Sequence, residues 1–291
     1  LTWTVIGTEK TSFRYCPIGF LYSNSGYGLF CRTEEIKLYL LGFMNSKVAT
    51  SLLQILSPSM GFESGYLRKL PLIISGLSND GVELVEDCIC ISQNDWDSFE
   101  TSWDFSVHPL IMFSRNLQDA TAIGAAMQYY YGGHPQTSSP LEICWLLWKG
   151  QANQQFRELK ANEEELNRIF IDIYGLQEEL TPEVANKDVT VHYLVDTKDD
   201  IPASMQGSNY VLTRREAVVS LISYAVGCMF GRYSLDVDGL VYAGGDFDAK
   251  YCRWVGYFVD QIDEHVDENG DLIGGGWAGC SLFKYDGIRK D

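Results

Sequence analysis

Three features are missing from this chain of 291 residues. None of its eight prolines stands next to another, none of its eight cysteines forms a CxxC pair, and no apolar run reaches the roughly 18–20 residues that span a bilayer. The longest apolar candidate, residues 217–230, is shorter and contains serine and glycine. The sequence therefore predicts neither a membrane span nor a zinc site built from paired cysteines.

The start of the sequence lacks an initiator methionine, a basic cluster and an apolar h-region. We therefore expect no secretory signal and a chain cut from something longer. The cysteines are scattered, and several sit in apolar runs such as residues 89–91 and 143–145. This pattern indicates reduced, mostly buried thiols in a cytoplasmic protein, with no metal site.

Positive charge is scarce as well, with 22 basic against 39 acidic side chains and a net charge of −17. That balance argues against a nucleic-acid partner for most of the chain. Residues 1–75 differ, because they hold seven basic and four acidic side chains, a net +3 that leaves −20 for the remainder. A polyanionic partner would meet this part of the chain, unless the excess arises by chance.

Hydrophobic periodicity and turn residues predict an α+β fold, with a mixed strand and helix lobe followed by a mainly helical C-terminal region. Thr33 and Thr213 are predicted helix N-caps. The polar middle of the longest helix, residues 153–165, is expected to be exposed to solvent or to bridge two lobes. Short strands are expected within 1–32 and 66–74, helices at 34–56, 80–93, 116–131, 140–174 and 213–230, and loop with irregular strand at 188–212 and 236–291.

Several motifs have ordinary structural explanations. Residues 274–279 satisfy GxGxxG, but the helix and acidic residue that a dinucleotide site needs do not follow them, so a glycine turn is expected. Residues 236–239 and 267–271 lack the glutamate of a calcium loop and are interpreted as Asp-Gly and Asn-Gly turns. The four histidines, His108, His134, His192 and His265, are far apart and have no nucleophile partner, which predicts structural or surface roles.

Three groups of stretches resemble known proteins. Residues 13–20, the run YLLGFMNSKVA at 39–49 and residues 70–72 are similar to DNA target-recognition domains. The second group is residues 95–110, and the third is 162–176, 188–191, 222–236 and 242–245. These two groups resemble the region downstream of the recognition domain in adenine-specific DNA methyltransferases of BREX phage-defence systems, the PglX family. Residues 246–291 resemble nothing recognisable and are interpreted as a subfamily insertion.

The resemblance implies a cytoplasmic enzyme that methylates the N6 amino group of adenine, with double-stranded DNA and other BREX proteins as partners. It also implies S-adenosyl-L-methionine as cofactor of the intact enzyme. Residues 1–75 would be the C-terminal part of the target-recognition domain, 76–180 a helical spacer and 181–291 a C-terminal α+β domain. Such an enzyme needs a (D/N/S)-P-P-(Y/F/W) segment against the flipped base, and this chain has no adjacent prolines. We therefore expect no catalytic residues and no bound cofactor in this chain.

The charge distribution and the resemblance together predict DNA contacts in residues 1–75. An arginine can bind guanine through two hydrogen bonds, whereas a lysine more often contacts phosphate. Lys37 is instead interpreted as a solvated surface charge. Two other functions stay open, a DNA specificity subunit of a restriction-modification system and an acidic protein-interaction module. The candidate basic residues are Arg14, Arg32, Lys47, Arg68 and Lys69, with Asn24, Tyr27 and Asn45 as polar neighbours.

Overall fold

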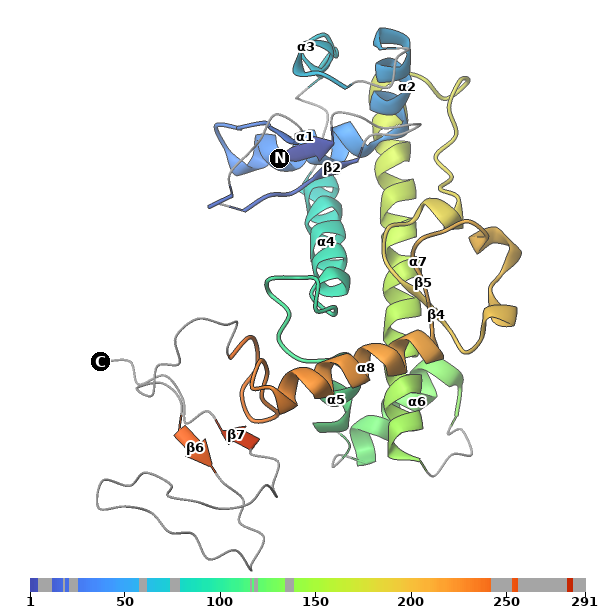
Figure 1. The fold of residues 1–291 in the computed structure, drawn as a ribbon. Coiled ribbons are helices and arrows are strands. Elements are labelled where there is room, and N and C mark those ends of the chain that lie inside the picture. The colour runs from blue at the N-terminus through green and yellow to red at the C-terminus, as the bar shows by residue number, and fades with distance from the viewer. Residues whose placement is uncertain are drawn as a thin grey trace, which may run out of the picture. The chain divides into compact units, whose positions relative to one another are not determined.

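A computed structural model of the protein describes residues 1–4, 12–17, 19–20, 26–57, 62–73, 79–115, 117, 120–133, 139–241, 253–255 and 282–284. The chain divides into two compact units. The first comprises Leu1–Trp96 with Lys149–Thr213, and the second comprises Asp97–Trp148 with Arg214–Asp291. Helices dominate and the sheets are small (Figure 1), so the predicted α+β class is confirmed. No helix among the described residues is both long and apolar enough to cross a membrane.

A three-stranded antiparallel sheet begins the first unit. Its central strand β1 (Thr2–Thr4) lies between β2 (Phe13–Arg14) and β3 (Gly26–Gly28). Trp3 is paired with Phe13 on one side and with Tyr27 on the other, and the ring centroids are 5.5 and 5.7 Å apart. Because residues directly opposite on neighbouring strands point to the same face, the three rings form one row. The short strands expected within residues 1–32 are confirmed.

The helix predicted over residues 34–56 is two helices, α1 (Glu34–Asn45) and α2 (Lys47–Leu56). Ser46 separates them with an extended backbone, at φ −71° and ψ 159°. Its hydroxyl donates to the Phe43 carbonyl oxygen at 2.6 Å and also caps the start of α2. The prediction of one helix is wrong because a serine hydroxyl can compete for backbone partners while the hydrophobic spacing continues across the break.

The strand predicted over residues 66–74 is wrong where the structure describes it. Tyr66 and Leu67 belong to the short helix α3 (Ser64–Leu67), and a turn follows. Leu67 and Leu70 are both buried, three residues apart as helical and turn geometry requires. A short apolar run does not distinguish a strand from a helical turn, and here the turn is formed.

The core of the first unit forms where three helices meet. The predicted second helix is α4 (Asn79–Trp96), and α1 crosses it at Gly42. A Cβ atom at Gly42 would lie 2.9 Å from Cγ2 of Val85 and 3.5 Å from the Phe170 ring, so the close approach requires glycine. Phe170, which is completely buried, comes from α7 (Pro140–Tyr174), the long helix that the sequence predicts.

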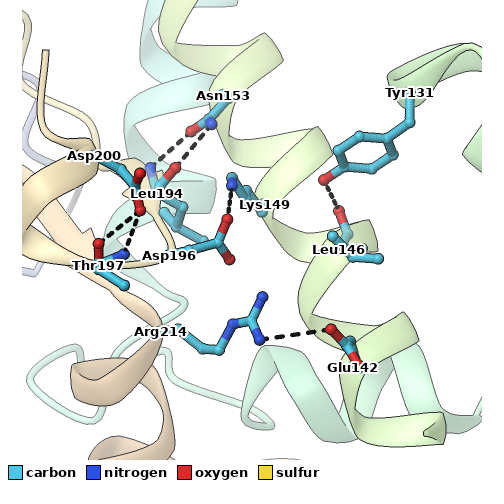
Figure 2. A network of polar contacts seen from close by, with 10 residues as sticks. All are labelled: Tyr131, Glu142, Leu146, Lys149, Asn153, Leu194, Asp196, Thr197, Asp200 and Arg214. Carbon is cyan, nitrogen blue, oxygen red and sulfur yellow. Dashed lines mark hydrogen bonds and ion pairs between the residues drawn. The ribbon is translucent and has the colours of Figure 1, made fainter. Parts of the chain in front are cut away.

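Asn153 of α7 binds the backbone of the first unit's second sheet. This sheet is the parallel pair β4 (Tyr193–Val195) and β5 (Val211–Thr213). The Asn153 side chain accepts a hydrogen bond from the Leu194 N–H at 2.7 Å and donates to the Leu194 carbonyl at 2.9 Å (Figure 2). Asn153 is only 9% exposed, so both backbone groups of Leu194 are satisfied inside the protein by one carboxamide.

Three further side chains in or beside the polar middle of α7 bind residues 182–191, which lie between α7 and β4 and contain one of the 3-10 helices that the structure describes. The Asn167 amide donates to the Pro182 carbonyl, the Glu164 carboxylate accepts from the Val184 N–H, and Lys160 donates to the side chain of Asn186. The sequence predicts that residues 153–165 are exposed or bridge two lobes, but it does not predict these hydrogen bonds. Part of the polar character of α7 is explained by its binding to a later part of the chain. Among the described residues, the 3-10 helices are η2 (Asn186–Asp188), η3 (Lys198–Asp200) and η4 (Ala203–Met205).

The second unit is built from helices and one described strand pair. The predicted Ala-rich helix is α6, and α8 begins directly after Thr213 as predicted. The rings of Phe105, Tyr224 and Tyr233 pack together with centroids 5.2–5.8 Å apart. In the same unit Arg214 pairs with Glu142 at 3.6 Å (Figure 2). Its elements are α5 (Pro109–Arg115), α6 (Ala120–Tyr131), the start of α7, α8 (Arg214–Met229), and the antiparallel strands β6 (Arg253–Val255) and β7 (Leu282–Lys284).

Candidate nucleic-acid interface

Four of the predicted basic residues are exposed on the first unit. Arg14 lies on β2, Arg32 precedes the cap of α1, and Arg68 and Lys69 follow α3. None of the four has a carboxylate within ion-pair distance among the residues that the structure describes. Their charges are therefore not neutralised by described acidic side chains and face solvent, as a phosphate-binding surface requires.

Asn45 holds the strand that carries Arg14. Its side-chain oxygen accepts from the Phe13 N–H at 3.0 Å, and its amide nitrogen donates to the carbonyls of Phe13 and Leu41, both at 3.0 Å. Because Phe13 is buried and side chains alternate along a strand, Arg14 points outward. The carboxamide of Asn45 is thus engaged within the fold, and the residue positions Arg14.

Lys37 differs from the four exposed cations, because it is neutralised within the fold. Its Nζ lies 2.7 Å from the Glu34 carboxylate and 3.2 Å from the Tyr15 hydroxyl, and 4.4 Å from the centre of the Tyr15 ring. The hydrogen bond to Glu34 raises the pKa of Lys37. Lys37 is therefore half-buried and ion-paired, and its interpretation as a solvated surface charge is wrong.

The remaining candidates are not gathered at one place. Tyr27 packs its ring against Trp3, on the face of the sheet opposite to Arg14. Lys47 is half-buried at the start of α2, and its N–H donates to the Asn167 side chain at 2.9 Å. Asn24 lies outside the described residues.

Arg68 and Lys69 follow α3, and a long-range hydrogen bond joins the sheet to the residues that lead into α3. The indole nitrogen of Trp3 donates to the Phe62 carbonyl at 2.8 Å, which ties β1 to the residues that lead into α3. The Lys69 Nζ lies 5.6 Å from the centre of the Tyr66 ring, a cation–π distance that leaves its three donors available to another acceptor. This pair offers two adjacent positive charges at one exposed turn.

The described residues hold no other evident chemical site. No group of three or more His, Cys, Asp or Glu side chains in the described part could bind a metal ion. The six described cysteines are free thiols, of which Cys144 is buried and Cys90 is exposed. In the Asp-Gly motif at 236–239, Gly239 has φ +90°, a backbone conformation that favours glycine, and Asp238 pairs with Arg115. The other glycine and Asp-rich motifs, 274–279 and 267–271, and the histidines at 134 and 265 lie outside the described residues.

The structural roles predicted for His108 and His192 are confirmed. The Nδ1 of His108 accepts from the Leu110 N–H at 3.2 Å, so its Nε2 carries the proton and donates to the Ser220 hydroxyl at 2.9 Å. Both ring nitrogens are therefore engaged inside the second unit. His192 binds the carboxylate of Asp95 through its backbone N–H at 3.1 Å and its ring Nδ1 at 2.9 Å.

Burial lowers the pKa of His108 to about 4, and this predicts an acid-sensitive second unit. In the unfolded chain the pKa of His108 is near 6.5. Between pH 6.5 and 4 the unfolded chain therefore binds a proton at His108 that the folded chain does not bind. The stabilising effect of the neutral ring is complete above pH 6.5 and declines as the pH falls toward 4. We expect a loss of about 2 kcal/mol in the free energy of unfolding between pH 6.5 and 5. Denaturant unfolding at both pH values measures it, and His108→Gln should remove this part of the slope; an unchanged slope in the variant would contradict the prediction.

The chain matches two curated proteins over most of its length. It is 39% identical over 278 residues to the adenine-specific methyltransferase PglX of Lacticaseibacillus casei (strain Zhang), covering 94% of this chain. The chain therefore belongs to the PglX family, as the predicted resemblance implies. The adenine-specific methyltransferase BrxX of Escherichia coli O9:H4 (strain HS) is 32% identical over 248 residues, 83% of this chain. No family model matches.

The extent of the PglX match changes one expectation. It covers 94% of this chain, which is more than residues 1–245 account for, so it extends into the last part of the sequence. The expectation that residues 246–291 resemble nothing recognisable is therefore wrong for part of this stretch, while its interpretation as a subfamily insertion stays a prediction. The PglX-like chain spans only 20% of the length of that protein and 18% of the length of BrxX.

Proposed function

We propose that this chain is a segment of a site-specific DNA adenine-N6 methyltransferase of a BREX phage-defence system. The observation that carries the proposal is the 39% identity to PglX over 94% of the chain. Because the substrate would be genomic DNA, the protein would act in the bacterial cytoplasm, with other BREX proteins as partners. Residues 1–75 would be the C-terminal part of the recognition domain, 76–180 a spacer and 181–291 a C-terminal domain.

Within this proposal, the exposed cations Arg14, Arg32, Arg68 and Lys69 contact DNA. Their exposure and their lack of a described acidic partner support the role. The two lysines among the original candidates, Lys47 and Lys69, suit phosphate, and an arginine can in addition bind a guanine edge in the major groove. Asn45 acts indirectly by fixing the strand of Arg14, while contacts by Asn24, Tyr27 and Lys47 stay predictions.

Methyl transfer itself is assigned to another part of the intact enzyme. S-adenosyl-L-methionine would be its methyl donor, but the residues present here do not fit that cofactor. Two described strands, β3 and β5, each lead to a helix, and neither is followed by a glycine-rich loop: residues 29–33 contain no glycine, and Thr213 passes directly to Arg214. The chain also has no adjacent prolines. This chain alone is therefore proposed to be non-catalytic.

The purified 291-residue chain is accordingly expected to transfer no methyl group to DNA. The chain is incubated with unmethylated DNA and radiolabelled S-adenosyl-L-methionine, and label in the DNA is counted. An intact enzyme that contains this chain serves as the positive control on the same DNA. Sequence-specific label transfer by the chain alone would show that it does contain a catalytic site.

A further inference from the structure

Phe30 is the most exposed aromatic residue among the described residues of the first unit. It follows β3 by two residues and is 80% exposed. The residue before it, Leu29, pairs with Leu1 just beyond the two strands: the Leu29 N–H donates to the Leu1 carbonyl at 2.8 Å, and the Leu1 nitrogen donates to the Leu29 carbonyl at 2.9 Å. The sheet therefore fixes the backbone next to Phe30, while the ring itself is exposed to solvent.

Phe30 lies on the same face of the three-stranded sheet as Arg14. The other face carries the row of three aromatic rings and packs in the core. On the outer face Arg14 lies opposite Thr2, and Thr2 lies opposite Gly28. Because side chains alternate along an extended chain, Phe30, two residues after Gly28, falls on this outer face too. At Gly26, on the same face, a Cβ atom would meet no other atom within 4 Å, so this part of the face is open.

The sequence around this face combines positive charge with aromatic rings. Residues 10–33 hold three basic and six aromatic side chains and no acidic one, although 39 acidic residues in 291 would place about three in a stretch of this length. Phosphate groups attract cations and repel carboxylates, while the bases offer flat rings and thymine methyl groups to apolar side chains. An exposed ring beside exposed arginines therefore has the chemistry that binds nucleic acid.

We propose that Phe30 contacts a base of the double-stranded DNA that Arg14 and Arg32 bind. Arg32 is two residues further along the chain, at most roughly 7 Å away along the backbone. This distance is comparable with the widths of the two DNA grooves, about 6 and 12 Å. An arginine on the phosphate backbone at this spacing brings the Phe30 ring to the base edges in the adjoining groove. The inference rests on the proposed function, in which the exposed cations contact DNA, and adds an apolar contact with the bases.

Phe30→Ala in the intact enzyme tests the proposal through the salt dependence of binding. Affinity for DNA that contains the site the enzyme methylates should fall about tenfold, the equivalent of 1.4 kcal/mol. The slope of log affinity against log salt should not change, because an apolar contact neutralises no phosphate. Arg14→Ala should instead reduce that slope by about 1. Fluorescence anisotropy at several salt concentrations measures both quantities, and Phe30→Leu, which keeps an apolar side chain, should restore part of the affinity.

The matched control is Trp103→Ala, which removes an aromatic residue that is 93% exposed in the second unit and has Asp104 beside it. This change should leave both the affinity and the slope as they are. A photoreactive phenylalanine analogue placed at Phe30 locates the contact without removing the ring. Mass spectrometry is expected to find it linked to a base of the DNA, and the same analogue at Trp103 is expected to yield no such product.

Three results would overturn the inference: unchanged affinity in Phe30→Ala, a changed salt slope in that variant, or no link from position 30 to a base above the Trp103 control. Links to a peptide or to a lipid instead of DNA would assign the ring to another partner. Methylation of DNA by the unaltered enzyme is measured in parallel. An enzyme that neither binds nor methylates DNA refutes the proposed function itself, whereas one that does both without needing Phe30 refutes this inference alone.

Discussion

Arg68→Ala combined with Lys69→Ala is expected to weaken DNA binding by the intact enzyme and to flatten its dependence on salt. Both side chains are exposed and have no acidic partner among the described residues, so their removal should cost contacts with DNA rather than stability. If both bind phosphate, the slope of log affinity against log salt should fall by about 2. If Arg68 binds a guanine edge, the loss should be larger, because such a contact contributes about 1–3 kcal/mol.

The matched control is Lys187→Ala combined with Lys198→Ala, two exposed cations of the same unit that lie beyond residue 75. Each is adjacent to an aspartate, in η2 and η3 respectively, and should contribute little to DNA binding. Fluorescence anisotropy at several salt concentrations gives the slope, and methylation of the specific site gives a second readout. Loss of methylation in the control pair, with Arg68 and Lys69 dispensable, would show that the DNA surface lies elsewhere.

Asn153→Ala is expected to destabilise the first unit strongly. It removes both partners of Leu194 and leaves a backbone N–H and a carbonyl without their partner in the interior. Each unsatisfied buried group costs about 1–3 kcal/mol, so the free energy of unfolding should fall by about 2–4 kcal/mol. Denaturant unfolding measures the total, and hydrogen exchange of the Leu194 amide reports the local effect.

The control for this change is Glu158→Ala, on the same helix but exposed. Its effect should stay within about 0.5 kcal/mol, as for most surface substitutions. An Asn153→Ala chain that keeps slow exchange at Leu194 and normal stability would mean that water or a shifted side chain replaces the carboxamide. The role of Asn153 in holding β4 would then have to be abandoned.

Elements whose signals are local in the sequence were predictable. The long helix over residues 140–174 follows from its start signal and its sustained periodicity, and the structure has it at those bounds. The cap at Thr33 was predictable for the same reason, since its hydroxyl accepts from the Ile36 N–H only three residues away. Charge and resemblance likewise singled out Arg14, Arg32, Arg68 and Lys69 as candidates before any geometry was known.

Hydrogen bonds between residues far apart in the chain could be identified only from the tertiary structure. Asn45 is of a residue type that can contact DNA, yet its side-chain amide binds the backbone of Phe13, 32 residues earlier. The sequence predicts that Asn153 lies on a solvated helix face, yet both polar atoms of its side chain bind the backbone of Leu194, 41 residues later. The sequence does not show whether an asparagine carboxamide binds water, DNA or a buried backbone group, because all three offer it the same hydrogen bonds. Residue patterns were therefore enough to predict the family, the class of fold and the helices with local signals. Which polar side chains hold the fold together, and which stay exposed to a partner, depends on contacts between residues far apart in the chain and so follows from the folded structure.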